Sequence, residues 1–148
     1  MRQSVQKILT AIVLLCSVNA AYANEALVLV ASQESPIHEL TSLEIRKLYL
    51  GFNVRDRSER QIVALTNKSD TRVMTVFLQN VMAMTQRAYN RRLLTLAVQS
   101  GRARPQSVAS LDQLHELLLS NRMMVTCMWK ADVDEFSGLK VLRVLWTE

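Results

Sequence analysis

A short polar segment with a neighbouring arginine stands between two apolar stretches in the middle of the chain. Residues 62–65 are apolar and include β-branched side chains, and residues 73–81 show helical spacing of apolar side chains. A strand, a short polar loop and a helix start bring backbone N–H groups together where they can bind an anion. The side chains near this turn that could bind an oxyanion are Asn67, Ser69, Thr71 and the permanently charged Arg72.

A serine earlier in the chain could contribute to the same site. Ser32 follows an apolar run at residues 26–31, and open α/β sheets hold ligands off the carboxyl ends of their strands. The alternative for the whole turn is a capped helix start that binds nothing, because Ser69, Asp70 and Thr71 can each serve as the N-cap. Both interpretations stay open from the sequence.

Other reactive residue types form no recognised catalytic or metal-binding pattern. His38 and His115 have no nearby nucleophile, and neither a G-x-S-x-G nor an H-E-x-x-H motif occurs. Residues 132–135 are acidic but lack the glycine and the distant glutamate of a calcium-binding loop, so a solvated loop is predicted there. We therefore predict that the chain is not an enzyme and has no cofactor or metal site.

The beginning of the chain has the composition of a secretory signal peptide. Basic residues precede an apolar run at residues 8–16, and residues 21–23 have the small-x-small pattern of a cleavage site. We expect residues 1–23 to be removed, which leaves residues 24–148 as a single periplasmic domain.

Cleavage would also change the charge and the cysteine content. The net charge would fall from +5 to +3, because Arg2 and Lys7 leave with the signal peptide. The remaining basic residues are interspersed with acidic ones, which argues against nucleic acid as a partner. Cys16 would leave as well, so Cys127 would stand alone in an apolar run, where a buried and unreactive thiol is expected.

Strands and helices are expected to alternate along the rest of the chain. Four apolar runs have strand length: residues 26–31, 62–65, 123–129 and 140–146. Helical spacing or a capping box marks the segments between them: residues 42–50, 71–81, 85–98 and 111–120. This order predicts an α/β fold in which a mixed sheet lies between helical layers.

Several short motifs occur in a fixed order: Ser35-Pro36, Leu48-Tyr49-Leu50-Gly51-Phe52, Ser69-Asp70-Thr71-Arg72, Gly101-Arg102 with Pro105, and Val108-Ala109-Ser110. In this order and spacing they resemble the small, type-2 periplasmic-binding-protein-like family related to phosphate ABC-transporter substrate-binding proteins. The resemblance covers nearly all of residues 24–148. It implies a single lobe of a type-2 binding protein, since a complete two-lobe protein of this kind is about twice as long.

The resemblance implies two possible functions. The first is recognition of a small oxyanion, phosphate foremost, for an ABC transporter or a sensor, through Ser32, Asn67, Ser69, Thr71 and Arg72. The second is a ligand-free interaction module of the same fold that docks to an envelope transporter or signalling protein. Asp70 stands where the family turn usually has glycine, and its negative charge favours the second hypothesis. The retained Ser69, Thr71 and Arg72 favour the first.

Overall fold

Strands and helices alternate along the described part of the chain. The computed structural model describes residues 25–148, and the predicted signal peptide at residues 1–23 lies outside this range. The elements are, in chain order, β1 (Ala26–Ser32), α2 (Ser42–Tyr49), β2 (Val63–Asn67), α3 (Thr71–Phe77), the π-helical turn η1 (Leu78–Met82), α4 (Gln86–Ser100), β3 (Gln106–Val108), α5 (Leu111–Ser120), β4 (Met124–Trp129), α6 (Lys130–Glu135) and β5 (Leu139–Thr147).

The strands of residues 25–148 form one five-stranded mixed sheet in the order β3-β2-β4-β1-β5. Strand β2 runs parallel to β3 and β4, with Leu65 opposite Thr126. Strand β1 runs antiparallel to both β4 and β5, with Leu27 opposite Trp129 and Ala31 opposite Val125. The carboxyl ends of β2 and β4 therefore meet at one end of the sheet, and the carboxyl end of β1 lies at the other.

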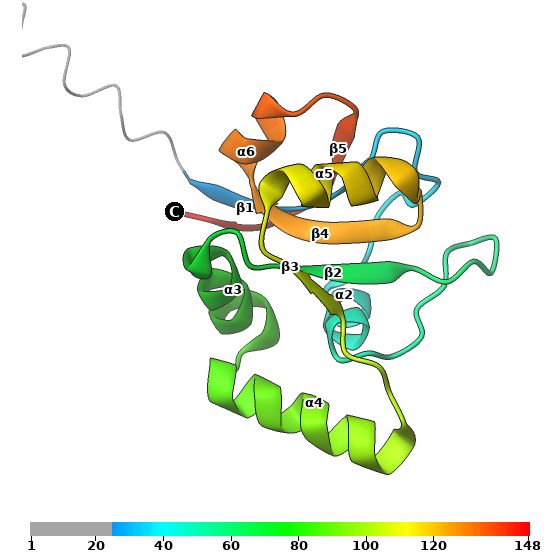
Figure 1. Ribbon diagram of the computed structural model, residues 1–148, viewed down its shortest axis with the longest axis vertical. Coiled ribbons are helices and arrows are strands. Elements are labelled where there is room, and N and C mark those ends of the chain that lie inside the picture. The colour runs from blue at the N-terminus through cyan, green and yellow to red at the C-terminus, as the bar shows by residue number, and fades with distance from the viewer. Residues whose placement is uncertain (1–24) are drawn as a thin grey trace, which may run out of the picture.

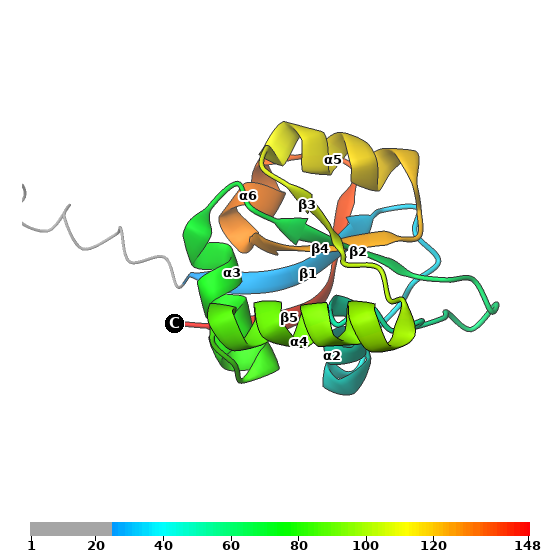
Figure 2. The same ribbon diagram turned by 60° about the horizontal axis from the view of Figure 1, so that its bottom comes forward.

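Helices cover both faces of the sheet, with α5 and α6 on one side and α2, α3 and α4 on the other (Figures 1 and 2). Side chains of β1 alternate between the two cores. Leu27 and Leu29 pack with the helices α2, α3 and α4, and Val28 and Val30 pack with α5 and α6. Because both faces are buried, the strand is apolar throughout instead of alternating with polar residues. The predicted α/β fold with a mixed sheet between helical layers is confirmed.

Local sequence signals set the start of several helices. The Thr41 hydroxyl accepts a hydrogen bond from the Glu44 N–H at 3.2 Å, and the Glu44 carboxylate accepts one from the Thr41 N–H at 2.8 Å. This reciprocal pair is the capping box that the sequence predicts for α2. At α5, the Ser110 hydroxyl accepts from the Gln113 N–H at 3.4 Å, which is one half of the predicted box.

Two elements differ from the sequence prediction. Strand β3 is only three residues long and forms because it pairs with β2 at the edge of the sheet. Helix α6 occupies the acidic segment that was expected to be a solvated loop. There Val133 is buried in the core, and Lys130 pairs with Asp134 one turn later on the helix. Both elements depend on contacts with distant parts of the chain, which leave little trace in local periodicity.

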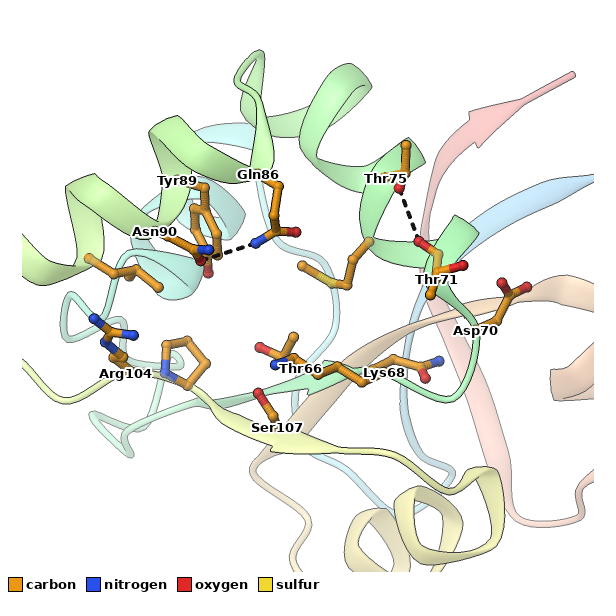
Figure 3. Close-up of a pocket in the computed structure, with 14 residues that line it drawn as sticks. Thr66, Lys68, Asp70, Thr71, Thr75, Gln86, Tyr89, Asn90, Arg104 and Ser107 are labelled. Carbon is orange, nitrogen blue, oxygen red and sulfur yellow. Dashed lines mark hydrogen bonds between the residues drawn. The ribbon is translucent and has the colours of Figure 1, made fainter.

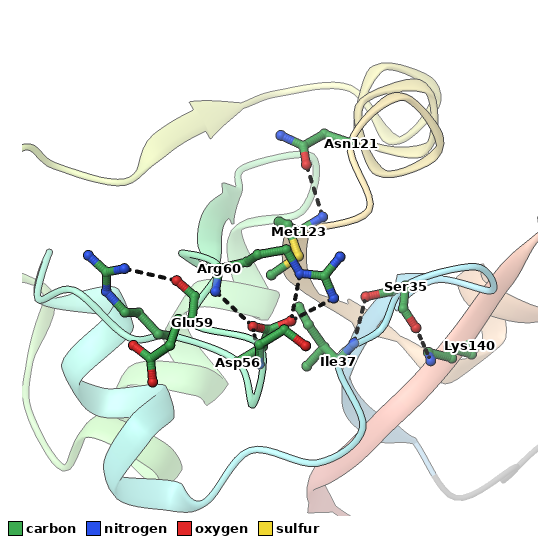
Figure 4. A network of polar contacts seen from close by, with 10 residues as sticks. Ser35, Ile37, Asp56, Glu59, Arg60, Asn121, Met123 and Lys140 are labelled. Atoms are coloured by element: carbon green, nitrogen blue, oxygen red, sulfur yellow. Dashed lines mark hydrogen bonds and ion pairs between the residues drawn. The ribbon is translucent and has the colours of Figure 1, made fainter.

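Polar contacts hold the loops near the amino ends of β2 and β4 (Figure 4). Asp56 accepts hydrogen bonds from the N–H groups of Ser58 and Arg60 and pairs with the Arg60 guanidinium at 2.9 Å. The Ser35 hydroxyl accepts from the Ile37 N–H at 3.2 Å, and the Ser35 carbonyl accepts from Lys140 Nζ at 2.6 Å. Polar side chains at this end of the sheet therefore serve loop structure.

None of the helices in residues 25–148 combines the length and the apolar character needed to cross a membrane.

Candidate functional site

The turn between β2 and α3 is built around Asp70, which is the N-cap of α3. Its Oδ1 atom accepts a hydrogen bond from the Arg72 N–H at 2.8 Å, and its Oδ2 atom accepts one from the indole Nε1–H of Trp129 at 2.8 Å. These hydrogen bonds lower the pKa of Asp70 because they favour the ionised carboxylate, and the bond from Trp129 has the largest effect. Of the three possible caps that the sequence offers, the structure uses Asp70.

The Arg72 side chain extends toward Glu25, the residue that precedes β1. Its guanidinium forms a two-pronged ion pair with the Glu25 carboxylate at 2.7 and 3.1 Å, and lies 5.4 Å from the centre of the Trp129 ring. The hydrogen bonds and charge of Glu25 raise the pKa of Arg72. The positive charge expected at an anion site is therefore used in an ion pair at the protein surface.

Asn67 and Ser69 form hydrogen bonds with each other, and Asn67 also forms one with the sheet. The buried Asn67 side chain donates from Nδ2 to the Cys127 carbonyl at 3.0 Å. Its Oδ1 atom accepts from the Ser69 N–H at 2.9 Å and from the Ser69 hydroxyl at 2.6 Å. The Ser69 proton is thus directed to Asn67, and these two residues shape the loop in the same way as an Asx turn.

Ser32 is not part of this constellation, which corrects the expectation from the sequence. Its hydroxyl is buried and accepts a hydrogen bond from the Glu34 N–H at 3.3 Å. The reason for its position is strand direction. Because β1 is antiparallel to β4 and β4 is parallel to β2, the carboxyl end of β1 lies at the opposite end of the sheet from Asn67.

A cleft of about 550 Å³ lies beside the turn, between strands β2 and β3 and helices α3 and α4 (Figure 3). Gln86 and Asn90 of α4 face Thr66 and Ser107 of the strands across it. Among the residues predicted to bind an anion, Asn67 and Thr71 line this cleft, and Ser32, Ser69 and Arg72 do not.

Two cationic side chains line the cleft. Arg104 lies at one end and Asp70 at the other, with Lys68 between them (Figure 3). Within residues 25–148 neither Lys68 nor Arg104 forms an ion pair, whereas both oxygens of Asp70 already accept hydrogen bonds. The even mixing of basic and acidic residues expected from the sequence does not hold here: residues 71–111 contain six arginines and no acidic residue, which adds to the positive field.

Contacts outside the cleft fix the segments that carry these charges. The Lys68 N–H donates to the Val108 carbonyl at 2.8 Å, which joins the end of β2 to β3. The hydroxyl of Tyr89 on α4 donates to the Tyr49 carbonyl at 2.6 Å, and burial raises the pKa of Tyr89. Gly51 lies against the Arg104 loop so closely that a Cβ atom there would be 2.5 Å from the Ala103 carbonyl oxygen.

Sequence reasoning missed several polar residues of the cleft, among them Lys68, Gln86, Asn90 and Arg104. Lys68 lies within the turn that the sequence singled out, so its position beside Asn67 was a usable signal. Arg104 comes close only because β3 pairs with β2, and this pairing was not predicted.

The remaining reactive groups of residues 25–148 form neither a metal-binding cluster nor an exposed thiol. No three His, Cys, Asp or Glu side chains of this range lie close enough to hold a metal ion. Cys127 is fully buried, burial raises the pKa of its thiol to about 12, and the thiol donates to the Tyr49 hydroxyl at 3.3 Å.

Comparison with known proteins identifies similar folds. No protein-family model matches this sequence, and no curated protein sequence is similar to it. The structure resembles an ABC-type phosphate transport receptor from Vibrio cholerae, with a TM-score of 0.60 and 17% identity over 82% of this chain and 46% of the receptor. It also resembles a putative phosphate ABC transporter substrate-binding protein from Clostridium perfringens, solved with bound phosphate, with a TM-score of 0.61 and 14% identity over 82% of this chain and 45% of that one.

These comparisons show a shared fold. The chain spans less than half the length of the structures that it matches. Its five-stranded mixed sheet with flanking helices therefore corresponds to about half of a phosphate-binding protein, as the sequence resemblance implied.

Proposed function

We propose that this domain binds a small oxyanion, with phosphate as the first candidate, in the cleft between β2, β3, α3 and α4. The observation that carries the proposal is the pair of cations, Lys68 and Arg104, which line the cleft without a carboxylate partner in residues 25–148. Such side chains attract and hold anions by charge-assisted hydrogen bonds. Asn67 and Thr71 form the wall at the helix start.

The fold similarity supports phosphate as the first ligand to test. One matching structure is a putative phosphate ABC transporter substrate-binding protein that contains phosphate. By analogy, we propose that the domain acts in the periplasm as a binding protein without enzymatic activity, and that it presents its ligand to an ABC transporter or a sensor. The predicted signal peptide at residues 1–23 is consistent with that location.

A second candidate function is favoured by a specific observation. Arg72 is engaged by Glu25, and the Asp70 carboxylate occupies the capping position at the start of α3. A turn whose charged groups are already satisfied is what a ligand-free interaction module of the same fold would have. The two functions differ in whether Lys68 and Arg104 bind an anion.

Calorimetric titration of the purified protein with inorganic phosphate, at low and moderate salt, tests the proposal. We expect a saturable signal that weakens at least tenfold in Arg104→Gln and in Lys68→Gln. The matched control is Arg72→Gln, which removes an equal charge outside the cleft and should change the affinity by less than threefold. If millimolar phosphate produced neither heat nor a rise in melting temperature, phosphate binding would be excluded and the interaction module would become the leading function.

A further inference from the structure

We infer that the preferred ligand of the cleft is an organic oxyanion, in which a phosphate or carboxylate group is carried by a larger organic body. This inference rests on the proposed anion-binding function and specifies the class of ligand. It departs from inorganic phosphate for three reasons: the size of the cleft, the chemistry of its wall and the distribution of its charges.

The cleft is much larger than an inorganic oxyanion. Its volume of about 550 Å³ lies in the range of roughly 300–1,000 Å³ that is typical of sites for drug-sized organic ligands. The cleft is open to solvent, so water molecules occupy the volume that a ligand does not fill. A phosphate ion would displace only a few of them and would leave most of the wall in contact with water.

Much of that wall is apolar and belongs to the core. Met74, Tyr89 and Leu93 contribute to it, and each is less than 10% exposed, while Pro105 adds a further apolar surface. An inorganic ion gains nothing from such a surface. An organic body placed along it would bury apolar area and release water, which favours binding.

Neutral polar groups also face the cleft. Gln86 donates from Nε2 to Asn90 Oδ1 at 3.0 Å, and this bond leaves the Gln86 carbonyl oxygen and the Asn90 amide protons for a ligand. A carbonyl oxygen accepts hydrogen bonds and repels a fully ionised oxyanion. The pair therefore suits hydroxyl, amine or carbonyl groups on an organic body.

The charged side chains of the cleft favour one orientation of a bound ligand. Arg104 lies at one end of the cleft and Asp70 at the other (Figure 3). An anionic group is attracted to Arg104 and Lys68 and repelled by Asp70. The uncharged part of the ligand would then extend along Tyr89 and Met74 toward Asp70.

The test compares the affinities of matched ligands for the protein, which is purified from cells that express the full-length chain. Isothermal titrations use inorganic phosphate against phenyl phosphate, and acetate against benzoate. We expect the aromatic member of at least one pair to bind about tenfold tighter than its inorganic or methyl counterpart, since burying the ring adds apolar contact. The pair that shows this gain identifies the anionic group.

Three variants assign the effect to the cleft. Arg104→Gln should weaken the tighter ligand at least tenfold. Met74→Ala removes part of the apolar wall and should reduce the advantage of the aromatic ligand over its counterpart. Gln86→Leu changes an exposed side chain, so it tests the polar wall without a risk to folding, and it should alter the ranking of phenyl phosphate against glycerol 3-phosphate.

The outcomes separate the two proposals. If phosphate binds through Arg104 and neither aromatic ligand exceeds its counterpart, the organic-ligand inference is overturned and the anion-binding function stands. If none of the four ligands binds, the anion-binding function fails, and the inference fails with it. If the aromatic ligand binds equally well to wild type and Arg104→Gln, it occupies another site and the inference is overturned.

Discussion

Asp70 Oδ2 accepts a hydrogen bond from the indole Nε1–H of Trp129 at 2.8 Å, which ties the turn after β2 to the carboxyl end of β4. The other carboxylate oxygen caps α3. The backbone at this position is extended, with φ −135°, so the turn does not require glycine. Asp70, which departs from the motif of the family that the sequence resembles, therefore has a structural task of its own.

The first prediction concerns stability and pH at Asp70. We expect Asp70→Asn to lower the free energy of unfolding at pH 7 by about 1 kcal/mol, because the amide disturbs the bonds to Trp129 and Arg72. The folded protein lowers the pKa of Asp70, so its carboxylate stabilises the fold above the ordinary value of 3.8. That contribution is lost as the pH falls through the lower pKa of the folded state.

Urea denaturation from pH 7 to pH 2.5 measures this effect. The difference in free energy of unfolding between wild type and Asp70→Asn should become smaller below about pH 4. Glu116→Gln, which changes an exposed carboxylate on α5, is the control and should show little difference at any pH. If the difference in free energy of unfolding between wild type and Asp70→Asn stayed constant down to pH 2.5, the stabilising role assigned to the Asp70 carboxylate would be contradicted.

The second prediction concerns the charge of Asp70 beside the cleft. Asp70→Gly should strengthen phosphate binding about two- to threefold, as expected from removing a screened repulsion of roughly 0.5 kcal/mol. Calorimetric titration measures the change, and Asp112→Asn on α5 is the control for net charge. An increase well above tenfold would instead mean that the turn at α3 is itself an anion site that Asp70 blocks.

The third prediction concerns Gly51, which has φ +80° and lies against the Ala103 carbonyl. Gly51→Ala should destabilise the protein by about 2 kcal/mol or more, because it adds backbone strain and a contact of 2.5 Å. It should also weaken phosphate binding, since Arg104 follows Ala103 in the same loop. Thermal unfolding and calorimetric titration measure the two effects.

Gly101→Ala is the matched control for this variant. Gly101 also has a positive φ, +62°, but a Cβ atom there would meet nothing within 4 Å. We expect a cost of roughly 1 kcal/mol from strain alone and no effect on phosphate binding. Equal losses in the two variants would show that the close approach to Ala103 is unimportant.

The fourth prediction concerns the thiol of Cys127. Burial raises its pKa to about 12, so the reactive thiolate is scarce at neutral pH and the sulfur is inaccessible. A thiol reagent such as 5,5′-dithiobis(2-nitrobenzoic acid) should leave Cys127 unmodified in the folded protein and modify it completely in guanidinium chloride. Peptide mass spectrometry identifies the site, and rapid modification of the folded protein would contradict the prediction.

Much of the fold could be predicted from the sequence because its signals are local. The apolar run at residues 26–31 became β1, and the pattern Thr41–Glu44 became a capping box with both hydrogen bonds. The candidate site was predicted only in part. Asn67 and Thr71 line the cleft, but Lys68 and Arg104 were missed, and Arg72 is paired with Glu25 across 47 residues of sequence.

The sequence by itself determined strands β1, β2, β4 and β5, the starts of helices α2 to α5 and the layered α/β architecture, because periodicity and capping act over a few residues. The tertiary structure decided the composition of the cleft. Strand direction places Ser32 at the far end of the sheet, and pairing of β3 with β2 brings Arg104 to the cleft that Lys68 also lines. Strand direction and long-range ion pairs depend on the path of the whole chain, which no local pattern specifies.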